Sequence, residues 1–587
     1  MRNKLIIAFI LALLPTFASA YTNDEILRAM RAELKRSMNE LQLESLKKPY
    51  YIEYTLTVTN NYNIHSSLGA IQDSENQRGA TLDVGVRVGD YKFDNTNFAD
   101  FSLMFFGSGD EEETYSSRSV QIDGDFNSLR RELWLATDAA YKQAAEALTK
   151  KEASLKNRMR KDTTADFTYI APDKNYDTIP FPVFDIKKFE NVCKQVSAIF
   201  LNYPTIQTSA VGFEFIPKTV FYINSEGREY VKTQMYSGLE IAALAQSEDG
   251  MQVTNLYSAH GFTPGDLPDT DSLTNAAKEL AGKVSAFVPA KALEEPYSGP
   301  VLFEKQAAAQ MFAQVFAPNL ATLRQPISEG GMQESERNSA FQTKIGGRVL
   351  PEFLSITDSP SKSKIGNMPL VGHYKFDDDG VLAEDITIVD KGYLKTLASC
   401  RVPTKRVRMT NGHNRGGAAM FSVLELSADK KHQKTNTELK KQMLKLCKAR
   451  ELPFGIIIKR ITDINMLYTT LMRISANTFP FPMGNAKMPV IEAYKIYPDG
   501  REELVRGCEA NGFTVQSFKD ILNVSNTNYI MNYLAPAVTS PYMSGGEQFI
   551  GSTVIVPDLL FEDGEIRPLE GDFPKPPILS NPISKSK

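Results

Sequence analysis

The first hundred residues show a helical spacing of apolar positions followed by a strand-like one. Behind the capping box Thr22-Asn23-Asp24-Glu25, apolar residues recur every three to four positions, which predicts an amphipathic helix ending before Pro49. Apolar and polar residues then alternate from Ile52 to Val58 and again from Leu82 to Val88, as in half-buried strands, with a polar, turn-rich segment between the two runs. We predict an α+β start in which a helix packs on a strand pair.

The rest of the first half continues this mixture. Helices are expected at about 127–151, from about residue 185, and at 271–287, and strands at 211–216 and 219–223 before the turn Asn224-Ser225-Glu226-Gly227. Prolines at 289, 296 and 300 then mark a linker. We therefore expect an N-terminal domain over 21–288, a linker over 289–300 and a C-terminal domain over 301–587.

The second half has a different pattern. After a helix expected at about 303–323, short strand-like runs alternate with Gly, Asp and Pro, and one helix at 437–450 interrupts them. Such spacing is typical of a β-rich barrel or sandwich. The predicted fold is α+β, with a mixed α/β N-terminal domain followed by a β-rich C-terminal domain.

The first twenty residues have the pattern of a secretory signal peptide. Arg2 and Lys4 precede a short apolar run from Leu5 to Leu14, and Ala18-Ser19-Ala20 supplies a small-residue cleavage site. The alternative, a membrane anchor, needs about twenty apolar residues, which this run does not supply. We expect an exported chain, periplasmic or secreted, that begins at Tyr21 and has no membrane span.

Charge and cysteine content narrow the function classes. The formal charge is −4, and the two signs are well mixed without a basic stripe, so we expect no nucleic-acid partner. The four cysteines, Cys193, Cys400, Cys447 and Cys508, are widely scattered. Their spacing excludes a disulfide scaffold or zinc ribbon and leaves open buried thiols or up to two disulfides.

Few residues have the spacing of a known active site. No two of the five histidines share a helical turn, and there is neither HExxH nor a G-x-S-x-G elbow. The sequence Ser361-Lys362-Ser363-Lys364 matches S-x-x-K but lies in a polar loop, and Asp377-Asp378-Asp379-Gly380 lacks the alternating ligands of a calcium loop. We therefore predict no metal ligands and no catalytic residues of this chain's own.

One polar cluster is a candidate binding loop. Residues 410–417 combine Thr410, Asn411, His413 and Arg415 with three glycines. Glycine allows the backbone to approach a ligand closely, while Asn and Arg bind peptide groups and carboxylates directionally. Asn411, His413 and Arg415 are the predicted substrate contacts; the alternative is an elaborate structural turn.

Seven passages in order resemble the TldD/PmbA peptidase family. They are the Asn224–Gly227 turn, Val301-Leu302 before an Ala-rich helix, Lys344 to Val349, Asp377 to Gly380, Asp390 to Leu394, Thr410 to Arg415, and the helix opening at Thr437-Glu438-Leu439. The resemblance implies a two-domain α+β subunit, typically dimeric. It also implies that zinc-bearing members pair with metal-free relatives to degrade or trim unfolded peptides.

The sequence departs from the family pattern where zinc-bearing members hold their metal. Those members carry H-E-x-x-x-H on the helix that opens the C-terminal domain, and a cysteine near the C-terminus. Here Phe312 to Ala317 read Phe-Ala-Gln-Val-Phe-Ala, and Ser540 to Gln548 contain no cysteine. The resemblance thus favours the zinc-free branch, with zinc in a TldD-like partner subunit or with the chain paired to itself.

Three functions follow from these observations. The first is the metal-free subunit of a periplasmic peptidase complex that shapes the cleft for unfolded or short peptides. The second is a non-catalytic peptide-binding or assembly protein of the same fold. The third is a hydrolase with a site not visible in sequence, so whether this chain is itself an enzyme is left open.

Overall fold

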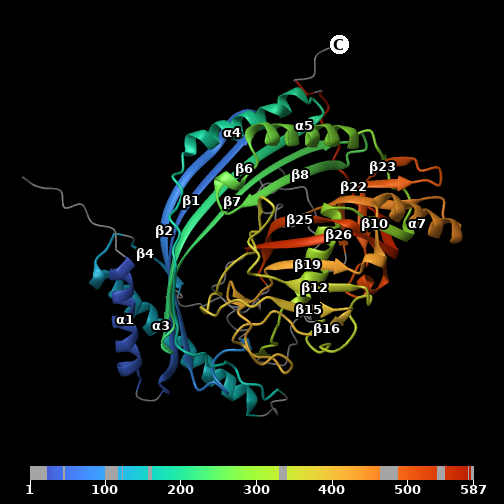
Figure 1. Cartoon of the computed structure of the whole chain (residues 1–587). Coiled ribbons are helices and arrows are strands. Elements are labelled where there is room, and N and C mark those ends of the chain that lie inside the picture. The colour runs from blue at the N-terminus through green and yellow to red at the C-terminus, as the bar shows by residue number, and fades with distance from the viewer. Residues whose placement is uncertain are drawn as a thin grey trace, which may run out of the picture.

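The computed structural model describes residues 23–43, 46–99, 117–121, 123–156, 162–328, 340–462, 487–537, 549–579 and 581–582. The expected signal peptide (1–20) and the cysteine-free segment 540–548 lie outside these residues. Two large sheets organise the described chain, and long strands of the first curve around the second (Figure 1).

The first sheet contains the strands of the N-terminal half. Its order is β4 (Ser117–Val120), β2 (Ala70–Val88), β1 (Pro49–Ser67), β6 (Ile206–Asn224), β7 (Glu229–Gln246) and β5 (Lys174–Asp177), and β8 (Gln252–Gly261) also pairs with β7. The turn expected at Asn224–Gly227 joins β6 to β7 and is confirmed.

Two predictions for this sheet were wrong in extent. The polar segment expected as a turn between residues 58 and 82 is the outer part of the β1–β2 hairpin, which stays paired up to Ser67 and Ala70 with one register shift between His65 and Ser66. The alternation was hard to see because, beyond Val58, only Tyr62 and Ile64 are apolar on the face of β1 that packs into the core. The strands expected at 211–216 and 219–223 are one strand, β6, which contains Pro217.

Helices cover one face of this sheet. Helix α1 (Asn23–Glu40) and α3 (Phe126–Leu155) pack at one end through residues such as Leu133 and Ile52, and α4 (Ile186–Ala198) and α5 (Thr270–Phe287) pack at the other through Val196 and Phe213 (Figure 1). The core residues at both ends are even-numbered on β1, such as Ile52 and Ile64, and odd-numbered on β6 after the irregularity at Ile206, such as Phe213 and Phe221. All four helices therefore lie on the same face of the sheet. The opposite face is left for the C-terminal half.

The second sheet contains a closed barrel. Strands β10 (Tyr297–Phe303), β21 (Gly455–Ile461), β22 (Lys487–Ile496), β24 (Cys508–Asn511) and β26 (Phe549–Pro568) pair in a ring, because β26 bonds both β10 and β24. From β26 the sheet continues through β19 (Val423–Ala428), β12 (Leu354–Asp358), β15 (Ile386–Asp390) and β16 (Tyr393–Leu394), while β25 (Ile521–Pro536) forms a hairpin with β26. The prediction of an α+β fold with a β-rich C-terminal part is confirmed.

The expected linker is partly sheet. Within 289–300, β9 (Lys291–Ala292) pairs with β23 (Glu502–Arg506), and Tyr297 begins β10. The prolines at 296 and 300 do not prevent strand formation here. Pro296 precedes β10 and Pro300 lies where the β10–β26 register shifts, so neither residue has to donate a backbone hydrogen bond within a regular pair of strands.

The helix expected at 303–323 is shorter and irregular. It runs as α6 (Gln306–Met311), a π-helical turn (Phe312–Phe316) and a 3-10 turn (Ala317–Leu320). The helix expected at 437–450 is α7 (Asn436–Ala449), which begins with a capping box between Thr435 and Glu438. Among the described residues, no helix has the length and apolarity needed to cross a membrane.

All four cysteines are free and buried. Burial raises the pKa of Cys193, Cys400 and Cys508 to about 12, so these thiols stay protonated and unreactive. Of the two alternatives for the cysteines, the structure has the buried thiols.

Candidate functional site

The polar loop at 410–417 folds back onto its own domain. Asn411 is buried; its Oδ1 accepts a bond from the Ser399 backbone N–H (2.7 Å), and its Nδ2 donates to the Leu397 carbonyl (3.0 Å). Gly412 has φ +75°, and a Cβ there would lie 2.3 Å from the Leu382 carbonyl oxygen. Gly412 therefore allows the backbone of the loop to lie against the backbone at Leu382.

His413 lies in a fully buried polar group. Its Nδ1 is 2.9 Å from the Asn411 carbonyl, and its Nε2 is 3.4 Å from Asp358 Oδ2. The Asp358 carboxylate also accepts bonds from the Ser422 hydroxyl and the Val423 N–H. A serine nucleophile needs a histidine as its base, with the carboxylate behind the histidine. Here the carboxylate stands between the other two, so the group is not a catalytic triad.

Arg415 is directed to two backbone carbonyls. Its guanidinium donates to Phe421 O (2.9 Å) and Gly551 O (2.7 Å) and lies over the Tyr374 ring. Asn411, His413 and Arg415 thus share one loop, but their side chains reach three separate groups of partners. Their role in substrate contact stays a prediction.

The turn Asp377–Gly380 binds the backbone of the loop at Asn414 and Gly416. Asp377 Oδ2 accepts from the Asn414 N–H (3.0 Å), Asp378 Oδ2 from the Gly416 N–H (2.8 Å), and Asp379 Oδ2 from Asn414 Nδ2 (2.9 Å). Asp377 to Gly380 is therefore the partner of the candidate loop, which the sequence could not indicate because about 35 residues separate them.

The same turn contacts the uncovered face of the N-terminal sheet. From β7, Tyr230 donates to the Asp378 carbonyl (3.0 Å) and Lys232 to Asp378 Oδ1 (2.9 Å), while Arg228 donates to the Gly380 carbonyl (2.5 Å). The loop and the turn together form one side of the junction between the two sheets.

Arg401 is the central residue of that junction, and sequence reasoning missed it. Its side chain is 1% exposed and donates to both oxygens of Glu226 (2.7 Å each), to the Thr168 carbonyl and to the Tyr51 hydroxyl. Glu226 belongs to the Asn224–Gly227 turn, so the only sequence signal was the acidic residue of that turn. In this buried guanidinium–carboxylate pair a single nitrogen, Nη2, lies 2.7 Å from both carboxylate oxygens, and the charged contact joins the two halves of the chain.

Acidic groups are concentrated around this pair. Glu53 accepts bonds from the hydroxyls of Tyr51 (2.7 Å) and Tyr222 (2.9 Å). Burial, followed by the charge of Glu53, raises the pKa of both tyrosines well above 10. Burial also raises the pKa of Asp379 to about 6, with Arg401 opposing the shift and Glu53 adding to it. The junction therefore favours the protonated form of Asp379.

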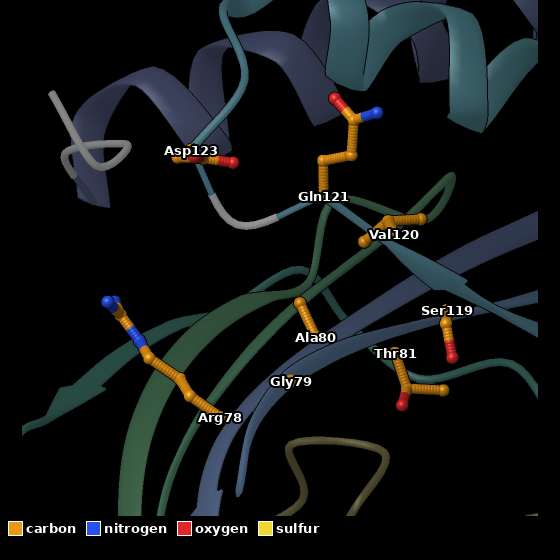
Figure 2. Close-up of a pocket in the computed structure, with 8 residues that line it drawn as sticks. All are labelled: Arg78, Gly79, Ala80, Thr81, Ser119, Val120, Gln121 and Asp123. Carbon is orange, nitrogen blue, oxygen red and sulfur yellow. The ribbon is translucent and has the colours of Figure 1, made fainter. Parts of the chain in front are cut away.

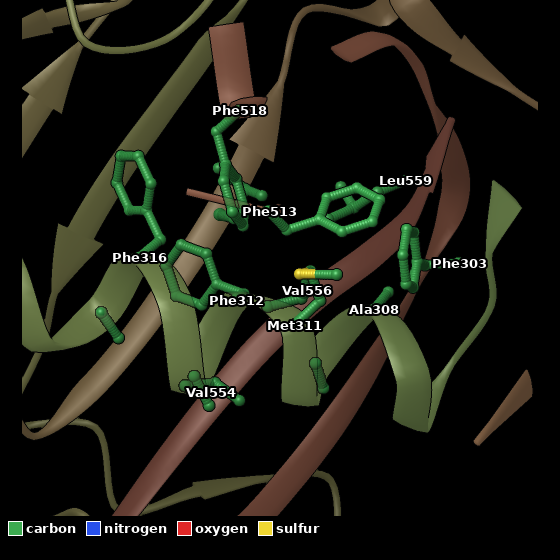
Figure 3. Packing of buried hydrophobic residues seen from close by; sticks show 14 of the residues in the cluster. Phe303, Ala308, Met311, Phe312, Phe316, Phe513, Phe518, Val554, Val556 and Leu559 are labelled. Carbon is green, nitrogen blue, oxygen red and sulfur yellow. The ribbon is translucent and has the colours of Figure 1, made fainter. Parts of the chain in front are cut away.

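In the zinc-bearing members of the family that this sequence resembles, the helix that opens the C-terminal domain carries the metal. In this chain the same helix is apolar. Phe312 and Phe316 are buried and stacked (5.7 Å between centroids), and they contact Phe518 inside the β-rich core (Figure 3). The polar side chains nearby, Gln310 and Gln314, bond each other (2.7 Å), and Gln314 also bonds the Thr462 carbonyl. Phenyl rings and paired amides do not fit a zinc ion, which takes imidazole, thiolate or carboxylate ligands.

Among the described residues, no group of three or more His, Cys, Asp or Glu side chains is arranged so that it could hold a metal ion. An open hollow of about 580 Å³ lies where β4 meets β2, lined by residues such as Arg78, Thr81, Ser119 and Asp123 (Figure 2). Its lining has no paired titratable groups and no nucleophile with a base, so it does not provide a catalytic site.

Comparisons with known proteins agree with the fold. Residues 296–566 match the family model of the PmbA/TldA metallopeptidase C-terminal domain. Among curated proteins, no match was found. Three solved structures are similar over most of the chain: a putative modulator of a DNA gyrase from Thermotoga maritima (TM-score 0.56, 14% identity, 93% of this chain and 100% of that one), TldE from Thermococcus kodakarensis (0.54, 13%, 92% and 100%), and a putative modulator of DNA gyrase from Bacteroides thetaiotaomicron (0.53, 13%, 93% and 98%).

At 13–14% identity the solved structures show only that the fold is shared, and the evidence for membership of a family comes from the family model. Together they cover both sheets and the barrel. The C-terminal half of the chain, residues 296–566, belongs to the TldD/PmbA family.

Proposed function

We propose that this chain is a metal-free subunit of an exported TldD/PmbA-type peptidase assembly that acts on unfolded or short peptides. In this assembly a zinc-bearing TldD-like partner supplies the catalytic metal. The present chain supplies part of the walls of the peptide cleft. Its fold makes it a peptidase-family protein; the division of labour between two subunits is the proposal.

The observation that carries the proposal is the packing of the helix at 306–320. Phe312 and Phe316 are fully buried among core aromatic residues, where zinc-bearing members have their H-E-x-x-x-H pair. An isolated zinc site could not form among these rings without emptying part of the core. The proposal therefore assigns the zinc activation of water to another chain.

A reconstitution experiment tests this proposal. The chain from Tyr21 onward is purified from its native host, and its co-purifying proteins are identified. Cleavage of an unstructured peptide is then measured with the chain alone, the zinc-bearing partner alone and both together. We expect cleavage only, or far faster, with both proteins. Equal cleavage by the partner alone would instead assign this chain the non-catalytic assembly role.

Two surface variants test whether this chain contacts the peptide directly. Arg406 and Arg408 are exposed next to the candidate loop, so their replacement does not disturb the core around Phe312. Replacing the exposed arginines with alanine should leave complex formation intact and reveal any peptide contact as a higher KM. An unchanged KM for Arg406→Ala and Arg408→Ala, with full activity of the complex, would place the peptide elsewhere.

A further inference from the structure

The chain does not end with the barrel. After β26 ends at Pro568, the Leu569 N–H donates to the Gly507 carbonyl (2.7 Å), and the chain then leaves the C-terminal sheet. Its last described residues lie beside α4 and α5, at the far end of the N-terminal sheet (Figure 1). The residues matched by the family model stop at 566, just before this tail, residues 569–582.

The tail crosses the turn between β7 and β8. Gln246 Nε2 donates to the Gly250 carbonyl of that turn (2.8 Å) and also to the Pro574 carbonyl of the tail (2.6 Å). Gly250 has φ +90°, and a Cβ at this position would lie 2.4 Å from the Pro574 oxygen and 3.2 Å from Phe573 Cβ. Turn and tail are therefore so close that only glycine fits between them.

The turn is held from the other side by the C-terminal domain. At the end of β23, Arg506 donates to Asp249 Oδ2 (2.8 Å) and to the Ala290 carbonyl (2.8 Å). Farther along the tail, Asn581 Nδ2 bonds the Pro204 carbonyl (3.1 Å) next to the start of β6. The β7–β8 turn is thus enclosed between Arg506 and the tail.

The attachment of the tail is weak compared with the Arg401 junction. Most tail residues are exposed, and Ile578 and Leu579 are 101% and 83% exposed. Prolines at 574, 576, 577 and 582 remove backbone donors and favour an extended chain that no ladder holds. An element with few buried contacts opens at a low free-energy cost.

We propose that residues 569–582 form a releasable clasp that holds the β7–β8 turn of the N-terminal sheet against the C-terminal domain. The Arg401 pair fixes one end of the junction permanently, and the clasp closes the other end. Release of the clasp frees the β7–β8 end of the sheet while the barrel and the Arg401 junction stay folded. This inference does not depend on the proposed peptidase role.

Two glycines provide a matched test. Gly250 and Gly500 each follow an aspartate in a hairpin turn, with φ +90° and +87°, and each donates its N–H three residues back. A Cβ on Gly500 meets nothing within 4 Å, whereas one on Gly250 meets the tail. Gly250→Ala and Gly500→Ala thus carry the same backbone strain, and only the first dislodges the clasp.

The readout is cleavage of the Glu570–Gly571 bond in the full-length folded chain by a glutamate-specific protease. Release of residues 571–587 is followed by mass spectrometry. Loss of the tail contact should speed this cleavage about tenfold in Gly250→Ala, with no change in Gly500→Ala. Equal rates in the two variants would overturn the clasp. If Gly250→Ala does not fold, Gln246→Met, which removes the shared donor, takes its place under the same two outcomes.

A truncation after Leu569 tests the effect on the sheet. The Gly250 N–H bonds the Ser247 carbonyl, and the Gly500 N–H bonds Tyr497 in the control turn. We expect hydrogen exchange to accelerate in the peptide covering 246–252 but not in the one covering 496–502. Unchanged exchange at 246–252 would show that the tail rests on the turn without holding it.

Discussion

Replacing Arg415 with alanine separates the two interpretations of the glycine-rich loop. The guanidinium makes two bonds to carbonyl oxygens, at 2.9 Å from Phe421 and 2.7 Å from Gly551, and lies 4.7 Å from the Tyr374 ring centroid. Hydrogen bonds to charged groups contribute about 1.5–3 kcal/mol each. Because the side chain is only half-buried, the lower end applies, and Arg415→Ala should cost about 2–4 kcal/mol of unfolding free energy.

The assay combines thermal and chemical unfolding with peptide cleavage by the assembled complex. Arg406→Ala is the control for the unfolding measurements, because Arg406 is exposed and its replacement should change stability by less than about 0.5 kcal/mol. Arg415→Lys should recover only part of the loss, since an ammonium cannot span both carbonyls as a planar guanidinium does. A wild-type unfolding curve for Arg415→Ala together with lost cleavage would refute the architectural reasoning and establish substrate contact.

Three further predictions follow from the junction and the N-terminus. Arg401→Met leaves the buried Glu226 carboxylate with the Tyr91 hydroxyl (2.6 Å) as a donor, so it should lower the free energy of unfolding, measured by chemical denaturation, by about 3–5 kcal/mol. Adding Glu226→Gln to this variant should restore part of the loss. A loss below about 1 kcal/mol would show that the pair does not hold the junction. The raised pKa of Asp379, about 6, means that the folded chain binds this proton more tightly than the unfolded chain, so stability should fall as pH rises from about 4 to about 6. Asp379→Asn should flatten that part of the melting-temperature profile and be at least as stable as wild type at pH 7; an unchanged profile would mean that another group titrates. N-terminal sequencing from the native host should give Tyr21, and Met1 on cytoplasmic protein would contradict export.

Local patterns predicted local structure well. The capped helices α5 and α7 begin within a residue of their predicted starts, because a side-chain cap followed by helical spacing is a short-range signal. The outer β1–β2 hairpin was missed because few of its residues are apolar: beyond Val58 only Tyr62 and Ile64 continue the alternation on β1. The π-helical turn at Phe312–Phe316 depends on core packing, which no helical spacing encodes.

The junction could not be predicted for a different reason. Arg401 and Glu226 are 175 residues apart, and each by itself looks like an ordinary polar loop residue. Likewise, the loop at 410–417 was recognisable as unusual from its glycines, but its partners Asp377, Asp378 and Gly551 appear only when the fold brings the turn at 377–380 and strand β26 to the loop. The sequence located the loop, and the tertiary structure determined what its side chains contact.

The central claim is that this chain has the peptidase fold without a metal of its own. Elemental analysis of the purified chain after mild dialysis, with its concentration measured independently, tests this most directly. The packing of Phe312 and Phe316 predicts well below one zinc per chain, and no gain on incubation with zinc followed by dialysis. One tightly bound zinc per chain, retained through dialysis, would contradict the account and require a ligand set elsewhere in the molecule.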